Sequence, residues 1–461
     1  MGEEVLNAQE RLAKNGRIKK TRKATIARHE QMSCKTYELK VDLSHISNRT
    51  RDLLRRLFLE AKWFYNDMVV KDLVFTENSW TKTRVQVRLK DKTFENRNLN
   101  VLSSQMRQSM VARAKHAISG LSASKKNGLK VGALKPKKRV GSIPLVQYGD
   151  TFEIIGDKIR IANIGQLLRV RGLGQIPTTT DSEVASALLI STRDGNYLLH
   201  VTVYRKPVVE SKPEAAAGCD AGVLNQMTVA NPWDGVGIQI REKVPLTESL
   251  KRINRRFSKR QKGSAGRREM LRRLNAEYRH ITNTRRDVRN KLTSTKSGLP
   301  SVYKTIATQK DHIKGWQKMW GTAVQTSAVG GMMAALRSKA HTPILVDRWM
   351  PTTQPCPRCG APNADLRGLE NLSNRTPECH ACGFRTDRDV WAAQNDALLI
   401  PLAERKPVDT KAATKLVGYL NSIPHVEASL VETPTFDTCG KETDGRQAPS
   451  DGSHPNSFGG L

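Results

Sequence analysis

The chain has 461 residues, enough for two or three domains, and 38% of them are hydrophobic but only 5% aromatic. Lysine and arginine number 77 against 44 acidic residues, and the resulting net charge of +33 points to a polyanionic partner, most plausibly nucleic acid. No apolar run approaches the ~20 residues that span a bilayer, and the N-terminus lacks the apolar core of a signal peptide, so we expect no membrane partner.

The N-terminal half predicts a small antiparallel β-barrel. Residues 1–31 are basic without apolar periodicity, and we expect a flexible tail there. Residues 33–41 alternate like a strand, and short alternating segments separated by Gly, Asp or Asn turns follow from 143 to 206. Barrels of this size commonly bind nucleic acid through one face and its loops.

Two helical segments interrupt this barrel. Residues 48–70 and 101–121 carry apolar residues at helical spacing, and the aromatic residues 63–65 in the first segment indicate core packing rather than base stacking. The loop after the second segment is rich in Gly and Lys without any acid, so a solvated loop and a phosphate-contacting loop are both open. The candidate contacts are Lys125, Lys126, Lys130, Lys135, Lys137, Lys138 and Arg139.

From residue 207 onward, strands and helices alternate, which predicts an α/β core. A buried strand ends in Asp220 and a glycine turn follows it. The helical region 246–296 is far more basic than a soluble helix pair needs, and it has too few acids for the salt bridges of an ordinary solvated face. Its candidate nucleic-acid contacts are Arg255, Arg256, Lys259, Arg260, Arg267, Arg268, Arg272 and Arg273.

Two C-x-x-C pairs give the strongest chemical signal, formed by Cys356, Cys359, Cys379 and Cys382. Nineteen residues (360–378) separate the pairs, and a glycine follows each pair, a pattern that predicts one four-cysteine zinc site rather than two unrelated pairs. The other three of the seven cysteines are scattered singly, as in a reducing cytosol, so we expect a cytoplasmic protein.

Carboxylates stand where a magnesium site needs them. Phosphodiester hydrolysis by two metals requires several carboxylates converging on two Mg²⁺ ions, and Mg²⁺ prefers carboxylate and water oxygens. Asp220 ends a core strand, whereas Asp387 and Asp389 open the apolar helix behind the second cysteine pair. The simpler alternatives are a turn role for Asp220 and a helix-cap role for Asp387.

These motifs resemble a known family. The segments GCDAGV (218–223), VDRWMPTTQPCPRCG (346–360) and CHACG with TDRDVWAAQNDAL (379–398) resemble the RuvC-like half of TnpB transposon nucleases and miniature type V CRISPR effectors. A weaker likeness, in SCKTYELKV and AKWFYND, extends the resemblance over roughly residues 32–400. Asp220 and Asp389 of this chain stand where members of that family have catalytic aspartates.

The resemblance implies an α+β multidomain protein that binds guide RNA and target double-stranded DNA in a bacterial cytosol. It predicts a wedge-like β-barrel (32–46 and 140–206) with a helical recognition insertion (47–139), and a RuvC-like, RNase H-fold α/β domain (207–354) with an inserted zinc ribbon (355–384) and a final helix (385–404). Residues 405–461 lose this pattern, and we expect them to be largely disordered.

One position departs from the family. A catalytic glutamate is expected where this chain has Gln309, a neutral amide that binds Mg²⁺ poorly, and the usual asparagine is Trp391. Either another acid replaces it, with Glu378 the best candidate and Glu370 the next, or the site is crippled. The predicted function is therefore a Mg²⁺-dependent, RNA-guided DNA endonuclease with two Mg²⁺ on Asp220, Glu378 and Asp389 and one structural Zn²⁺.

Two alternatives remain beside this prediction. The first is an RNA-guided DNA-binding protein with weak or no nuclease activity because of Gln309. The second is a plain zinc-ribbon DNA-binding factor, against which the spacing of Asp220 and Asp389 argues.

Overall fold

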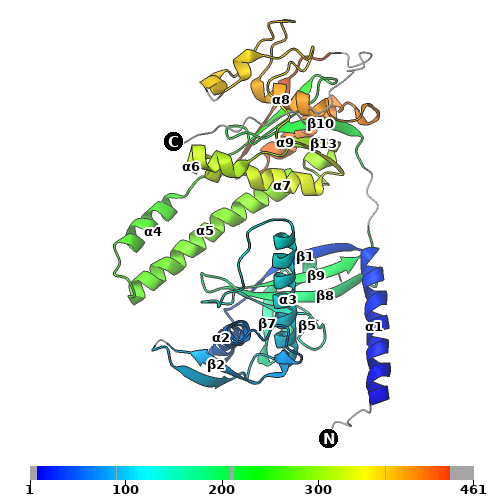
Figure 1. The fold of residues 1–461 in the computed structure, drawn as a ribbon. Coiled ribbons are helices and arrows are strands. Elements are labelled where there is room, and N and C mark those ends of the chain that lie inside the picture. Colours follow the sequence, from blue (N-terminus) through cyan, green and yellow to red (C-terminus); the bar gives the residue numbers. More distant parts are fainter. Residues whose placement is uncertain (1–7, 90, 178, 208–211, 369, 437–461) are drawn as a thin grey trace. The chain divides into compact units, whose positions relative to one another are not determined.

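The computed structural model describes residues 8–436 apart from 90, 178, 208–211 and 369. The chain divides into two compact units (Figure 1). The N-terminal unit comprises Met1–Val209 with Arg260–Ala276, and the C-terminal unit comprises Glu210–Lys259 with Glu277–Leu461. Within the described residues, no helix has both the length and the apolar character that crossing a membrane requires.

An antiparallel seven-stranded sheet curls into a nearly closed barrel in the N-terminal unit, in the order β4-β8-β9-β1-β7-β6-β5. Inward residues alternate with outward ones along β9, as the period of two predicts. The predicted first strand is confirmed as the central strand between β9 and β7. The strands are β1 (Ser33–Val41), β4 (Ser142–Leu145), β5 (Phe152–Ile155), β6 (Lys158–Ile161), β7 (Ile164–Arg171), β8 (Ser182–Ser191) and β9 (Tyr197–Arg205).

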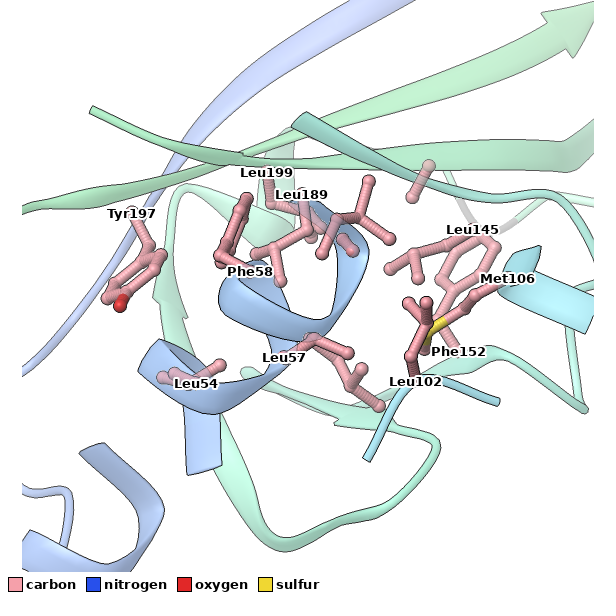
Figure 2. Packing of buried hydrophobic residues seen from close by; sticks show 14 of the residues in the cluster. Leu54, Leu57, Phe58, Leu102, Met106, Leu145, Phe152, Leu189, Tyr197 and Leu199 are labelled. Atoms are coloured by element: carbon pink, nitrogen blue, oxygen red, sulfur yellow. The ribbon is translucent and has the colours of Figure 1, made fainter. Parts of the chain in front are cut away.

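Helix α2 (Asn48–Val70) packs its apolar face against this sheet (Figure 2). The hydroxyl of Ser47 caps the helix by accepting a hydrogen bond from the backbone N–H of Thr50. Leu54 and Leu57 are completely buried, and the ring of Phe58 lies 5.7 Å from that of Tyr197. The aromatic residues 63–65 are also buried, which confirms that they pack in the core.

The insertion after α2 is a mixture of hairpin and helix, not purely helical. A two-stranded hairpin, β2 (Arg84–Arg88) and β3 (Phe94–Asn98), precedes α3 (Ser104–Lys126). Glu60 of α2 is fully buried, and its Oε2 accepts the backbone N–H groups of Val101 and Leu102 at 2.8 and 2.9 Å. This buried carboxylate therefore joins α2 to the segment that leads into α3.

The expectation of a flexible N-terminal tail is wrong for residues 8–30, which form α1 (Ala8–Glu30). Lys, Arg, Ala and Glu are good helix formers, but the helix has no apolar stripe that would reveal it. Its end is attached to the barrel, because Arg28 pairs with Glu183 at 2.6 Å and the ring of His29 stacks on Tyr204 at 3.7 Å.

The C-terminal unit is built on a six-stranded mixed sheet in the order β14-β13-β10-β11-β12-β15. Strands β10, β11 and β12 form an antiparallel meander, and β13 and β14 run parallel to β10 on its other side. The strands are β10 (Ala215–Asp220), β11 (Met227–Ala230), β12 (Val236–Glu242), β13 (Tyr303–Gln309), β14 (Thr342–Val346) and β15 (Val426–Glu432).

The remaining helices include a pair at residues 248–292 within the predicted basic region. That pair is α4 (Glu248–Ser258) and α5 (Ala265–Leu292). The other helices are α6 (Ile313–Ser327), α7 (Val329–Lys339), α8 (Arg388–Ala397) and α9 (Thr410–Asn421). Short 3-10 helices are η1 (Ser79–Thr81), η2 (Leu173–Gln175), η3 (Leu299–Ser301), η4 (Ala364–Leu366), η5 (Glu370–Ser373) and η6 (Leu402–Glu404).

The expectation of disorder from residue 405 onward is also wrong in part. Helix α9 and strand β15 lie in this region, and β15 pairs with β12 over Val426–Glu432. Asp409 caps α9 by accepting the N–H of Lys411 at 3.1 Å. Residues 437–461, which the prediction also covered, lie outside the described residues.

Helix α8 crosses β10 at unusually close range. A Cβ atom built on Gly218 would lie 1.9 Å from the backbone oxygen of Ala393 and 2.9 Å from the Cβ of Asp396. No side chain fits in that space, so the glycine allows backbone-to-backbone contact. This contact sets the distance between the end of β10 and helix α8.

We expect Gly218→Ala to destabilise the C-terminal unit by about 1–3 kcal/mol, because a rigid backbone contact must open. Gly418→Ala, in α9 with no atom within 4 Å of the new Cβ, is the matched control. It should be neutral or stabilising by about 1 kcal/mol, the difference in helix propensity. Urea unfolding measures both, and an equal effect of the two changes would refute the steric explanation.

Candidate metal centres

The four predicted cysteines form one cluster. The sulfur atoms of Cys356, Cys359, Cys379 and Cys382 all lie within 4.8 Å of one another. The Sγ atoms of Cys356 and Cys382 are 3.7 Å apart, and those of Cys359 and Cys379 are 3.6 Å apart. Tetrahedral zinc with Zn–S bonds of about 2.3 Å sets its sulfurs about 3.8 Å apart. The cluster could therefore hold a metal such as zinc.

The two cysteine turns have the same backbone geometry. The N–H of Gly360 donates to the Cys356 carbonyl oxygen and that of Gly383 to the Cys379 carbonyl oxygen, both at 2.8 Å. Each glycine has a positive φ, 75° and 68°, that other residues rarely adopt. Burial opposes ionisation of Cys379, but backbone N–H groups of its own turn lower the pKa of this thiol to about 7. The thiolate is the form that binds metal.

Trp391 joins α8 to the cysteine segment, by which we mean residues 355–384. Its indole N–H donates to the Pro355 carbonyl oxygen at 2.8 Å, and its buried ring lies 5.5 Å from that of Phe384. The tryptophan that departs from the family pattern thus has a packing role. The start of α8 is held by the cysteine segment.

The two aspartates that the sequence singled out lie together. Asp220 is the last residue of β10, and Asp389 lies in the first turn of α8. Burial, and then the negative charges of Asp389, Asp396 and Asp311, raise the pKa of Asp220 well above its usual range. Such crowding of carboxylates is costly without a cation.

Two of these carboxylates, Asp311 and Asp396, were missed by the sequence analysis. Asp311 follows the end of β13 by two residues, and burial raises its pKa to about 6. Asp396 is fully buried on α8, and its carboxylate oxygens make no hydrogen bond of ordinary geometry among the described residues, although the backbone N–H of Gln309 lies close enough to lower the pKa of this carboxyl. Its position seven residues after Asp389, two helical turns along one face, was the available signal.

The carboxylate oxygens lie farther apart than the ligand atoms of a single metal ion. Among the described residues, only the cysteines bring three or more candidate ligand atoms within 4.8 Å of one another. A two-metal site needs more room, because its ions lie about 3.5–4 Å apart.

The side chain of Gln309 is hydrogen-bonded to the loop after β14. Its side-chain N–H₂ donates to the carbonyl oxygens of Asp347 at 3.2 Å and Met350 at 2.6 Å, and its Oε1 accepts from the Thr352 hydroxyl at 3.2 Å. A carboxylate could not donate these two hydrogen bonds. The amide thus holds the loop that leads to the first cysteine pair.

A cation already faces Asp389. The guanidinium of Arg375 lies 2.6 Å from Asp389 Oδ2 and 3.8 Å from Asp387 Oδ2. Asn225 donates to the same Asp389 oxygen at 3.3 Å. Asp387 caps α8, since its side chain accepts the N–H groups of Asp389 and Val390. The cap role that the sequence analysis left open for Asp387 is confirmed.

Glu378, the predicted third acid, is placed differently. Its side chain is exposed, and its backbone pairs with Arg385 inside the cysteine segment. Among the described residues, no interaction links its side chain to Asp220 or Asp389. Glu370, the next candidate, begins η5.

The predicted basic residues fall into two groups. Lys125 and Lys126 end α3, and the loop that follows it carries the rest of the first group, with Arg139 donating to backbone oxygens of Ser191 and Thr192. The second group lies on α4, α5 and the turn between them. Two of its members, Arg272 and Arg273, are paired with Glu269 at 2.8 and 2.9 Å.

Among known protein families, the family described as "Cas12f1-like, TNB domain" matches residues 334–395 of this chain. A curated protein of Streptomyces pristinaespiralis, named "Putative RNA-guided DNA endonuclease", is 28% identical over 193 residues. That match covers 39% of this chain and 44% of the relative, so less than half of the relative's length is spanned.

Two solved structures are distant likenesses, each at 11% identity. A Cas12f1–sgRNA–target DNA complex matches over 80% of this chain and 99% of the other with a TM-score of 0.46. A CRISPR–Cas12f ternary complex matches over 76% and 79% with a TM-score of 0.26. The family match and the curated relative confirm the resemblance to TnpB-like proteins and miniature type V effectors that the motifs indicated.

We expect the purified protein to contain one Zn²⁺ and Cys379→Ser to lose it, because three thiolates hold the ion more weakly than four. Cys34→Ser is the matched control, since Cys34 is exposed and outside the cluster. Elemental analysis of both variants measures bound zinc. Wild-type protein without zinc or another metal would contradict the assignment.

Proposed function

We propose that this protein, whose residues 334–395 match the Cas12f1-like TNB domain, is an RNA-guided DNA endonuclease. Its partners would be a guide RNA and a target double-stranded DNA with an adjacent motif. The observation that carries the proposal is the convergence of Asp220 and Asp389 at one end of a mixed sheet. A DNA-binding zinc ribbon alone would need no such carboxylates.

The strand arrangement supports a RuvC-like, RNase H-fold assignment for the C-terminal unit. An antiparallel meander (β10, β11, β12) is extended on the other side of its first strand by two parallel strands. In sheets with parallel strands, sites form beyond the carboxyl ends of those strands. Asp220 stands at such an end, beside the end of β13.

Asp220 and Asp389 are the residues that would hold Mg²⁺, which in such sites activates the attacking water and stabilises charge on the phosphate. Asp387 fixes the first turn of α8 and thereby the position of Asp389. Arg375 neutralises Asp389 in the structure. It would have to release this carboxylate as metal and phosphate arrive, and its guanidinium is then suited to a phosphate oxygen.

The cysteine segment would be a structural zinc ribbon. Its metal would keep both cysteine turns rigid, and Trp391 would transmit that rigidity to α8. Zinc loss would then misplace Asp389 without touching it.

The basic groups would bind RNA and DNA through phosphates. The exposed Arg255 and Arg256 project from α4 near its C-terminal end, where a cation also suits the helix dipole. Each phosphate neutralised in this way releases counterions and makes binding weaken with salt.

A specific observation favours a second candidate, an RNA-guided DNA-binding protein with little or no nuclease activity. Gln309 stands where the family resemblance implies a catalytic glutamate, and its side chain is committed to the loop at 347–352. The two candidates differ in whether other carboxylates replace that glutamate.

We expect Asp220→Ala and Asp389→Ala to abolish cleavage of a target plasmid by the purified protein–RNA complex with Mg²⁺, while target binding persists. Loss of a metal ligand removes the electrostatic stabilisation, at a cost of at least about 100-fold in rate. Asp365→Ala is the control, because its exposed carboxylate pairs only with His380 among the described residues. A wild-type complex that binds its target and never cuts would establish the second candidate.

We expect the protein to purify with RNA, and the double change Arg255→Gln with Arg256→Gln to weaken its binding. The slope of log affinity against log salt should fall by about 1.4–1.8, for two lost phosphate contacts. Lys243→Gln is the control, since the ammonium of Lys243 is paired with Glu427. A titration at several salt concentrations measures the slopes. Equal affinity for the copurified RNA and for random RNA of the same length would show that binding depends on the positive charge of the protein alone and not on recognition of a guide RNA.

A further inference from the structure

We propose that Asp311 and Asp396 complete the divalent-metal site with Asp220 and Asp389, in the role that Gln309 cannot fill. The inference rests on the proposed function, because the metal would serve the same reaction. It names two ligands that neither the motifs nor the family resemblance assigned. It also replaces Glu378, whose side chain is exposed.

The burial of the Asp396 carboxylate is the observation that indicates a bound cation. The Asp396 side chain is fully buried on α8, and its carboxylate oxygens make no hydrogen bond of ordinary geometry among the described residues, although the backbone N–H of Gln309 lies close enough to lower the pKa of this carboxyl. A buried charge is costly unless it is paired or coordinates a metal. The guanidinium of Arg337 is close enough to lower the pKa of Asp396 by its charge, but it donates to the Thr308 hydroxyl at 2.8 Å and to the Gln309 carbonyl oxygen. Asp396 thus has a positive charge in its surroundings but no ion pair among the described residues.

The fold directs Asp396 toward the end of the parallel strands. Its Cβ lies against Gly218, two residues before Asp220 on β10. Helix α8 also contacts β13. Asp389 and Asp396, seven residues apart, share one face of α8. The helix therefore supplies two carboxylates to one strand end.

Asp311 lies near the same end of the sheet, because it follows the end of β13 by two residues. Strands β10 and β13 run parallel with Cys219 beside Thr308, so Asp220 and the residues after Gln309 leave the sheet side by side. A tight turn, in which the Asp311 N–H donates to the Gln309 carbonyl oxygen at 3.1 Å, holds the carboxylate near that end. Asp311 is half-buried, as a ligand open to a hydrated metal must be.

Charge supports the same assignment. Four carboxylates carry four negative charges, which equal the positive charge of the two divalent ions of a two-metal site. The mutual repulsion that raises the pKa of Asp220 is then the cost of a preformed site. The rival explanation is that Asp396 stays protonated and only fills space, in which case its charge is irrelevant to metal.

The experiment measures Mn²⁺ binding by the full-length, zinc-loaded protein freed of RNA, using the electron paramagnetic resonance of unbound Mn²⁺. Asp311→Asn and Asp396→Asn keep the side-chain shape and remove one charge. Each should weaken Mn²⁺ binding by at least about tenfold and reduce the metal-induced rise in melting temperature. Asp365→Asn, an exposed carboxylate of the cysteine segment, should bind Mn²⁺ like the wild type.

The outcomes separate this inference from the proposed function. If Asp311→Asn and Asp396→Asn bind Mn²⁺ and cut target DNA like the wild type, while Asp220→Ala does neither, the inference is overturned and the endonuclease stands. Loss of Mn²⁺ binding in Glu378→Gln alone would also overturn it. A wild type that binds its target but neither binds Mn²⁺ nor cuts would overturn both. Should Asp396→Asn fail to fold, the half-buried Asp311→Asn still decides.

Discussion

The contact between α8 and β10 is the constraint on which the C-terminal unit depends. Only a glycine at 218 lets the helix backbone approach the central strand closely enough for its oxygen at Ala393 to fill the space of a side chain. That approach brings Asp389 and Asp396 close enough to Asp220 for their charges to raise its pKa. The cysteine segment holds the same helix from outside through Trp391. Sheet, helix and cysteine cluster therefore act as one support for the carboxylates.

The cost of this arrangement is electrostatic. Carboxylates at one strand end repel one another, and burial removes the water that would screen them. Arg375 offsets part of the charge at Asp389, and Arg337 is close enough to lower the pKa of Asp311 and Asp396. The mutual repulsion of the carboxylates therefore opposes folding of this unit. Functional sites commonly carry such strain, which the rest of the fold must support.

Patterns local in sequence predicted local structure well. The bounds of β1 and α2 and the four-cysteine cluster follow from period, turn residues and spacing. Helix α1 was missed because it has no apolar stripe, and β15 because its partner, β12, is almost 200 residues away. Asp311 and Asp396 were missed for the same reason, since only the crossing of α8 over the sheet brings them to Asp220.

The contacts of Gln309 explain why the carboxylate that we propose in place of the family's glutamate would lie elsewhere in the chain and not at position 309. Its amide donates to two carbonyl oxygens of the loop that carries Met350 toward the cysteine segment. A glutamate there would turn a carboxylate toward those oxygens, a repulsive contact that costs at least the two hydrogen bonds. The residue has thus become part of the support for the cysteine segment. In the metal site that we propose, the further carboxylates would come from the neighbouring strand end and from α8, where Asp311 and Asp396 stand.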